Sequence, residues 1–320
     1  MKTNPFRSLV YNALIRTTFA RKLPLFSKIW NTLWRWQCRT YSGLVKSTLH
    51  GQPVILTNGH WYSLVCREYP RFNQPLYAIV KVLADRKPEP IQLVDVGAAV
   101  GDTVLFLEAN FGSQIGRYLC IDGDKEFYGF QEYNLSSVKN KCINYFALLS
   151  DKEELISSID KVDPTTGSAV GALKEQSETI DQILAKTGFG KVDVIKVDID
   201  GYDGKALGGA VNCLKSDRPL VIFEWNTPYY ELVGNSITQP FEVLSAAGYD
   251  HFLWFTNLGD FAFYTRGYDL NVLNTMQIYC KNQHSFNGRH YDVIAIHQNS
   301  GIDPNAIIHI NENQVQKSRY

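Results

Sequence analysis

The 320 residues are 45% hydrophobic and 20% charged, a composition typical of globular proteins and long enough for one large domain or two small ones. Lys+Arg and Asp+Glu both number 32, so the net charge is zero and gives no indication of a nucleic-acid partner. Apolar runs are shorter than the ~20 residues that span a bilayer, and bases interrupt any secretory signal. Six scattered cysteines without a CxxC pair argue against a disulfide framework or a zinc site, and they suit the cytoplasm.

The balanced total hides an asymmetric N-terminal extension, residues 1–49. Before Glu68 the chain has ten Lys or Arg and no Asp or Glu, so the remainder carries 22 bases and 32 acids. Residues 4–38 predict two amphipathic helices divided by Pro24. In the second helix, five residues fall within about 80° of Phe26 at 100° per residue, and they are Ile29, Trp30, Leu33, Trp34 and Trp36. Lys28, Arg35 and Arg39 fall on the opposite side.

Two interpretations of this extension remain open. The apolar face packs on the protein or on a second subunit in a homodimer, or residues 1–40 contact an anionic membrane peripherally, at its cytoplasmic side.

Residues 50–85 predict a hairpin and a helix ahead of the main sheet. PVIL and WYSLVC, separated by TNGH, predict a strand pair over 51–69 with a turn at Asn58-Gly59. Residues 74–85 predict a helix.

From residue 86 to 300 the pattern alternates between strands and helices, and residues 301–320 form a polar tail. Strands are expected at 92–97, 117–122, 143–148, 192–199, 219–224, 251–255 and 291–297. Helices are expected near 101–110, 125–139, 176–187, 203–214 and 238–247. This alternation predicts an α/β, Rossmann-like, doubly wound sheet of seven mostly parallel strands with an antiparallel edge element.

The first strand of this region leads into a glycine turn, LVDVGAAVGDT. Gly97 and Gly101 let the backbone bend tightly and approach a ligand, and the next helix points its free N–H groups there. The spacing is not the G-x-G-x-x-G of dinucleotide-binding enzymes. Asp95 would repel a pyrophosphate and attract an ammonium group. Asp122, which ends the next strand, can accept hydrogen bonds from ribose hydroxyls. Together these residues indicate a cationic nucleoside, and S-adenosylmethionine fits.

Here the sequence resembles the FkbM-type methyltransferases, a branch of the S-adenosylmethionine-dependent enzymes. The resemblance is carried by VDVGAAVGDT, ETIDQIL, VDVIKVDIDGYDGKALGGA and RPLVIFEW, and it covers about residues 50–300. Four positions depart from the family pattern. Ala99 stands where Asn is usual, Gly123 where Pro is usual, and Asp200 and Asp203 where Glu is usual.

The resemblance implies methyl transfer to a hydroxyl of a sugar, a glycolipid or another small natural product. It also implies a cofactor site lined by the turn and the two strand ends. The candidates for that site are Asp95, Gly97, Ala98, Gly101, Asp102, Asp122 and Asp198.

The segment KVDVIKVDIDGYD supplies the candidate catalytic residues. Because strand side chains alternate, Lys196, Asp198 and Asp200 are expected to share one face. Asp198 or Asp200 would take the proton of the acceptor hydroxyl, with Lys196 paired to a carboxylate as an orienting residue. Asp203 is expected to cap the following helix.

Alternatives at this site remain open. No metal is predicted, but a divalent ion would use Asp198, Asp200 and Glu224. The same D-x-D would suit a metal-dependent glycosyltransferase, and a non-catalytic membrane-associated scaffold with a vestigial nucleotide fold is the second rival. A histidine of the 284–290 loop is another candidate base. Aromatic residues after the strand ends would form a wall against a sugar or ordinary core; they are Trp225, Tyr229, Tyr230, Trp254, Phe255, Tyr264 and Tyr268.

Overall fold

The computed structural model describes residues 1–161, 167–169, 171–281 and 289–313. Its centre is an eight-stranded sheet. In spatial order the strands are β14 (Phe261–Arg266), β13 (Tyr249–Thr256), β15 (Tyr291–His297), β12 (Leu220–Trp225), β11 (Val194–Val197), β3 (Ile91–Val96), β4 (Ile115–Asp122) and β5 (Cys142–Phe146). The last five are parallel, whereas β15 runs antiparallel to both β12 and β13. The predicted Rossmann-like sheet with an antiparallel edge is confirmed, and β14 adds an eighth strand to the seven expected.

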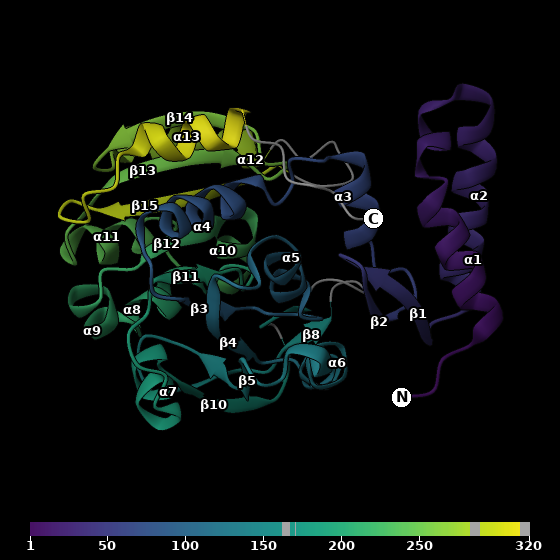
Figure 1. The fold of residues 1–320 in the computed structure, drawn as a ribbon, viewed down its shortest axis with the longest axis horizontal. Coiled ribbons are helices and arrows are strands. Elements are labelled where there is room, and N and C mark those ends of the chain that lie inside the picture. The colour runs from purple at the N-terminus through teal and green to yellow at the C-terminus, as the bar shows by residue number, and fades with distance from the viewer. Residues whose placement is uncertain (162–166, 170, 282–288, 314–320) are drawn as a thin grey trace.

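Helices cover both faces of the sheet because neighbouring strand residues point in opposite directions (Figure 1). Leu93 packs in one hydrophobic cluster and Val94 in the other. The first cluster is covered by α4 (Gln74–Arg86), α5 (Asp102–Phe111), α6 (Lys125–Asn134) and α13 (Pro304–Asn313). The second is covered by α7 (Ile180–Thr187), α8 (Asp203–Gly208), α9 (Val211–Ser216), α10 (Thr227–Val233), α11 (Gln239–Ala246) and α12 (Leu270–Lys281).

Local sequence fixes where several of these helices begin and end. Asp124 accepts N–H groups from the first turn of α6, and Thr179 with Gln182 forms a capping box at the start of α7. Helix α7 ends at Gly188, which adopts the left-handed conformation. Short elements complete the chain: η2 (Ser136–Val138), β6 (Leu148–Leu149), β7 (Leu155–Ser157), β8 (Asp160–Lys161), β9 (Gly167–Ser168) and β10 (Lys174–Glu178).

The N-terminal extension is a helical hairpin that stands beside the sheet rather than on it (Figure 1). It contains α1 (Pro5–Arg16), η1 (Thr18–Lys22) and α2 (Pro24–Thr40), so the two helices divided by Pro24 are as expected. Trp30 of α2 is buried against α1 and donates its indole N–H to the carbonyl of Leu14 at 3.0 Å.

The predicted hairpin over 51–69 is wrong in its pairing. Strand β2 (Gln52–Thr57) pairs with the preceding β1 (Leu44–Leu49) through a turn at His50-Gly51, both with positive φ. On the other edge of β2, the side chain of Asn134 hydrogen-bonds both the N–H and the carbonyl of Ile55. Because both edges of β2 are then occupied, WYSLVC cannot pair with it and forms the helix α3 (Tyr62–Glu68).

The expected polar tail also needs correction. Residues 304–313 form α13, whose Ile307 and Ile310 are buried, and this helix packs on α4. Asn311 is buried as well and donates to the carbonyl of Gly259 at 3.2 Å. The rest of the tail, 314–320, lies outside the described residues.

Candidate active site

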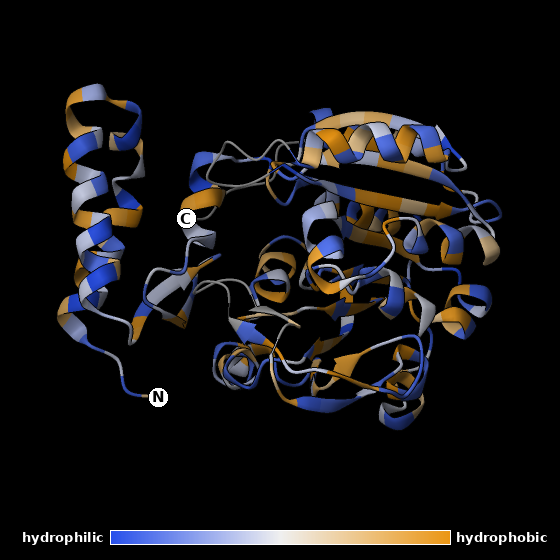
Figure 2. Ribbon diagram, turned by 180° about the vertical axis from the view of Figure 1, so that it is seen from behind, coloured by the Kyte–Doolittle hydropathy of each residue, from blue (hydrophilic) through white to orange (hydrophobic). Residues whose placement is uncertain are grey.

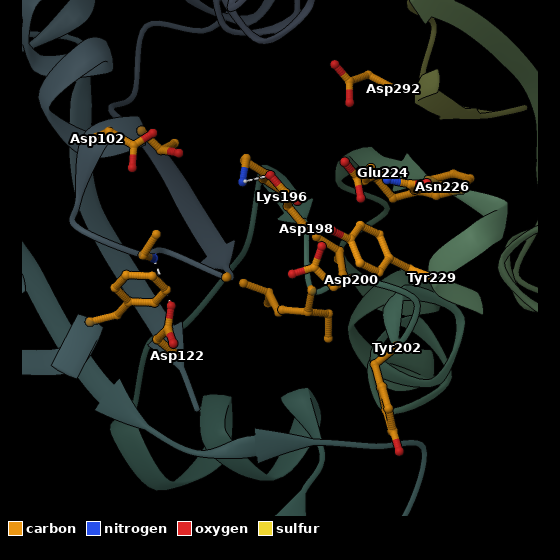
Figure 3. A pocket seen from close by; sticks show the side chains of 18 of the residues that line it. Asp102, Asp122, Lys196, Asp198, Asp200, Tyr202, Glu224, Asn226, Tyr229 and Asp292 are labelled. Carbon is orange, nitrogen blue, oxygen red and sulfur yellow. Dashed lines mark hydrogen bonds and ion pairs between the residues drawn. The ribbon is translucent and has the colours of Figure 1, made fainter. Parts of the chain in front are cut away.

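A cavity of about 570 Å³ opens at the edge of the sheet where the parallel strands end. Its walls come from the glycine turn after β3, the end of β4, the segment after β11, the end of β12, the helix α3 and the start of β15. The carboxyl ends of parallel strands are the usual ligand site of open α/β sheets. In Figure 3, Asp102 and Asp122 lie on one side of the cavity and Glu224 and Asp292 on the other.

The glycine turn is shaped by contacts within the chain. Gly97 and Gly101 have φ of 77° and 86°. A Cβ on Gly97 would lie 1.9 Å from the carbonyl oxygen of Asp198, and one on Gly101 would meet the side chain of Leu135 at 2.8 Å. The structure therefore requires these glycines for packing of the chain against itself, in addition to the tight bend expected from the sequence.

Ala99 occupies a strained position between the two glycines. Its φ of 43° is left-handed, a conformation that asparagine tolerates better than alanine. Its N–H donates to Asp122 Oδ2 at 2.8 Å, and its carbonyl accepts from Gln131 Nε2 at 3.0 Å. These two hydrogen bonds hold the strained turn in place, and the φ gives a physical reason why the usual family residue here is Asn.

Asp122 and Asp124 have separate roles. Asp122 is buried and accepts backbone N–H groups on both oxygens, from Ala99 and from Asp124. Burial nevertheless raises its pKa to about 7. Asp124 caps α6 through Glu126 and Phe127. Only Asp124 is thus a helix cap, and Asp122 fixes the glycine turn at the wall of the cavity.

Lys196 joins two of the predicted acids. Its Nζ lies 3.1 Å from Asp198 Oδ2 (Figure 3). The same Nζ lies 3.4 Å from Asp95 Oδ1. The predicted pairing of Lys196 with a carboxylate is thereby confirmed. Burial lowers the pKa of Lys196, but Asp198 and Asp95 outweigh it, so the pKa is raised overall and the ammonium stays protonated. Burial also raises the pKa of Asp95, and that of Asp102 to about 7.

Asp198 and Asp200 both line the cavity, but not as one face of a strand. Strand β11 ends at Val197, and Asp200 lies in a turn with a φ of 50°. The expected strand alternation through Asp200 is therefore wrong, because the chain turns as soon as it leaves the sheet.

Asp203 is the first residue of α8, yet its carboxylate accepts from the N–H groups of Ile199 and Gly201, which precede the helix. It closes the turn instead of capping the helix, which corrects that expectation. Burial, followed by repulsion from Glu224, raises its pKa well above the usual range.

Sequence reasoning missed Asp292, at the start of β15, and named His290, just before this strand, only as one histidine of the 284–290 loop. His290 Nε2 lies 2.9 Å from Glu224 Oε1, and Asp292 is directly opposite Glu224 in the antiparallel ladder. Burial lowers the pKa of His290, but Glu224 outweighs it and raises the value to about 9. Burial raises the pKa of Asp292 to about 7, although the residue is partly accessible from the cavity.

A usable signal was present for these two residues. Because β15 runs antiparallel, its first residues, not its last, reach the edge where the parallel strands end. The candidate base in the 284–290 loop can be assessed only at His290, since His284 lies outside the described residues.

Two further sets of residues named from the sequence are the alternative metal ligands and the aromatic residues after the strand ends. In the part of the chain that is described, no three His, Cys, Asp or Glu side chains are placed to hold a metal ion, and this includes the alternative set Asp198, Asp200 and Glu224. Of the seven aromatic residues proposed as a sugar wall, Tyr229 lines the cavity. Trp225, Tyr230, Trp254 and Phe255 are buried in the core instead.

Residues 95–251, about half of the chain, match the family model of the methyltransferase FkbM domain. The protein contains an FkbM methyltransferase domain. The match begins at Asp95 and includes the glycine turn, Asp122, Lys196 and Glu224, so it spans most of the cavity walls. His290 and Asp292 lie beyond the matched part of the FkbM domain, which is a second reason why the resemblance did not point to them.

Solved structures similar to the chain are distant. An FkbM methyltransferase from Methylobacillus flagellatus KT has a TM-score of 0.41 and 14% identity, over 73% of this chain and 60% of that one. An O-methyltransferase from Bacillus cereus in complex with SAH has 0.40 and 12%, over 72% and 80%. TYW2 from M. jannaschii in complex with AdoMet has 0.38 and 12%, over 80% and 86%. No curated protein matches the sequence. The assignment to the FkbM domain therefore rests on the family match.

Proposed function

We propose that the FkbM domain transfers the methyl group of S-adenosylmethionine to a hydroxyl of a sugar, a glycolipid or a small natural product. The observation that carries the proposal is one cavity with two unlike walls. A glycine turn and Asp122 form the first wall, and the second carries Asp198, Glu224 and Asp292. The first wall would bind the methyl donor, and the second would orient the acceptor and take its proton.

The residues of the first wall fit S-adenosylmethionine. Asp102 and Asp122 line the cavity at the glycine turn, and Asp198 of the second wall lies beside Gly97. Asp95 is fully buried next to Lys196, which is the counter-charge. This excess of acids favours a ligand with a sulfonium and an ammonium group and disfavours a pyrophosphate. Asp122 ends β4 at the wall, where a carboxylate can accept from ribose hydroxyls, and Phe127 and Leu148 offer apolar surface to a base nearby. When bound, the cofactor supplies an electrophilic methyl group.

On the second wall we assign the proton acceptor to Asp292. Its pKa of about 7, raised by burial, suits a group that must accept a proton near neutral pH. His290, bonded to Glu224, holds a positive charge beside it. Asp198 and Asp200, the bases expected from the sequence, border the same space and would position the acceptor oxygen for in-line attack, with Lys196 fixing Asp198.

Four aromatic residues that line the cavity support a sugar-containing acceptor. Trp61, Tyr62, Tyr202 and Tyr229 line the cavity and present ring faces and edges to a ligand.

None of the six cysteines is in a disulfide, which supports the cytoplasm as the location.

Isothermal titration calorimetry tests the assignment of the two walls. Wild-type protein should bind S-adenosylmethionine and S-adenosylhomocysteine. Asp122→Ala should lose that binding, and Asp200→Asn should retain it while losing methyl transfer. Thermal denaturation of both variants controls for folding. Binding of a UDP-sugar with Mn²⁺, without S-adenosylmethionine binding, would favour the glycosyltransferase instead. Mass spectrometry of sugar and lipid pools treated with isotopically labelled S-adenosylmethionine would identify the acceptor.

A further inference from the structure

The exposed apolar side chains of this protein are concentrated in its N-terminal hairpin. Ten of the seventeen exposed large hydrophobic residues in the described part of the chain belong to the first 36 residues. Leu25 is 77% exposed and Phe19 is 66% exposed. The other eight are Met1, Phe6, Leu9, Leu23, Phe26, Ile29, Leu33 and Trp36. Figure 2 shows hydrophobic segments along both helices of the hairpin, which stands apart from the sheet.

The structure divides the apolar stripe of α2 into two halves. Trp30 is buried, and its ring stacks on Trp34 with centroids 5.4 Å apart. Phe26, Ile29 and Leu33, which flank these residues on the helix, are exposed. Packing on the rest of the protein therefore accounts for one half of the stripe only. An apolar surface left open in this way marks an interaction site.

The exposed charged side chains of the hairpin are all basic. No Asp or Glu occurs before Glu68, and the exposed bases of the hairpin are Lys2, Arg16, Lys22, Lys28, Arg35 and Arg39. Arg21, by contrast, turns inward to Glu68. Because the hairpin carries bases and no acids, two copies docked through it would repel each other. An anionic lipid surface offers the opposite charge together with an apolar interior.

We propose that the hairpin α1–η1–α2 docks on an anionic membrane surface. Helix α2 lies in the plane of the interface, with Phe26, Ile29 and Leu33 inserted among the lipid chains. The long side chains of Lys28 and Arg35, on the opposite face of the helix, remain in water within reach of the headgroup charges. No helix among the described residues is long and apolar enough to cross a bilayer, so the contact is peripheral.

The hairpin is joined to the cavity through α3. Tyr11 of α1 donates its hydroxyl to the carbonyl of His60 at 2.6 Å, and Arg21 pairs with Glu68 at the end of α3. His60, Trp61 and Tyr62 are also cavity walls. Docking would therefore bring the α3 wall close to the lipid surface, where a glycolipid acceptor would be presented. This consequence rests on the proposed methyl transfer, whereas the docking itself does not.

The test is flotation of the full-length protein with phosphatidylcholine vesicles, with and without phosphatidylserine. Wild-type protein should float with the anionic vesicles. A triple variant, Phe26→Ser, Ile29→Ser and Leu33→Ser, should lower the partition coefficient by about tenfold or more, because three inserted side chains are lost. Lys28→Gln and Arg35→Gln should each lower it by about fivefold, and added salt should weaken binding further.

A matched control removes exposed apolar residues elsewhere, with Leu232→Ser, Leu270→Ser and Ile278→Ser in α10 and α12. This control should float like wild type. Equal flotation of wild type and the α2 triple variant would overturn the proposal, and so would no flotation at low salt. If a dimer formed instead and dissociated in the triple variant, the face would belong to a second copy. Flotation needs no activity, so failure of the methyltransferase proposal would leave this result unchanged.

Discussion

At the scale of single residues, Asp292 shows how neighbours set the chemistry of a side chain. It has no unusual sequence context, since it stands within the apolar strand YDVIAIH. Its surroundings decide its pKa: burial raises the value first, the charge of His290 lowers it, and Asp198 and Glu224 raise it again, to about 7. A carboxyl with this pKa exists in both forms near neutral pH, which is what a general base requires.

We expect Asp292→Asn to lower kcat by about 10²-fold or more, because the amide cannot take a proton. In wild type, kcat should rise with pH through about 7, as Asp292 becomes ionised. This rise should disappear in the variant, while the dissociation constant of S-adenosylmethionine stays the same. A pH–rate profile with the acceptor found by mass spectrometry measures both effects.

His290→Gln serves as the companion variant in this experiment. Removing the positive charge of His290 should move the rise in kcat to higher pH, since that charge lowers the pKa of Asp292. Full activity of Asp292→Asn at neutral pH would contradict the assignment and return the role of base to Asp198 or Asp200.

At the scale of elements, the turn between β3 and α5 depends on how closely the ends of β3 and β11 approach each other. Gly97 follows the last residue of β3, and the carbonyl of Asp198 occupies the space where its Cβ would lie. Asp198 N–H also donates to the carbonyl of Val96, so the two strand ends are tied together. The glycine turn and the acidic segment are therefore one structural unit, although about 100 residues separate them in the sequence.

Gly97→Ala should destabilise the protein by more than about 3 kcal/mol, because an unfavourable φ and a severe backbone clash add together. Gly188→Ala is the matched control, since its φ of 57° is also positive but no atom lies within 4 Å of the added Cβ. That variant should lose only about 1 kcal/mol. Chemical denaturation measures both free energies of unfolding, and equal losses would show that the contact with Asp198 is unimportant.

At the scale of the whole molecule, the fold gathers ionisable groups at one edge of the sheet. Asp102 comes from the start of α5, Asp122 from the end of β4 and Asp292 from the start of β15, and burial raises the pKa of each to about 7. The folded protein therefore binds protons at these groups more tightly than the unfolded chain, whose values are near 3.8. Each contribution to stability is fully present below pH 3.8 and is lost as the pH rises through about 7.

The Asp102→Asn variant isolates one of these contributions. An amide cannot ionise, so the variant does not lose stability through this group as the pH rises. Its melting temperature should therefore increase relative to that of wild type from about pH 4 to about pH 7. Differential scanning calorimetry at a series of pH values measures the difference. If the melting temperature of wild type instead rose relative to that of the variant over this pH range, the raised pKa of Asp102 would be contradicted. S-adenosylmethionine, through its positive charge, should reduce the difference.

Features that depend on nearby residues could be predicted from the amino-acid sequence. Strand and helix periodicity predicted the parallel sheet, and short motifs predicted the cofactor wall, because the residues that make a turn lie next to one another. Pro24 and the one-sided distribution of charge likewise predicted a basic helical hairpin.

Features that depend on residues distant in the sequence could be seen only in the folded chain. Asn134 occupies the second edge of β2, and the segment expected to pair there forms the helix α3. The antiparallel direction of β15 brings His290 and Asp292 to the cavity. The close approach of the Asp198 carbonyl explains why position 97 must be a glycine. Periodicity records which face of an element is apolar, but the partner that covers the face is chosen by the packing of the whole chain.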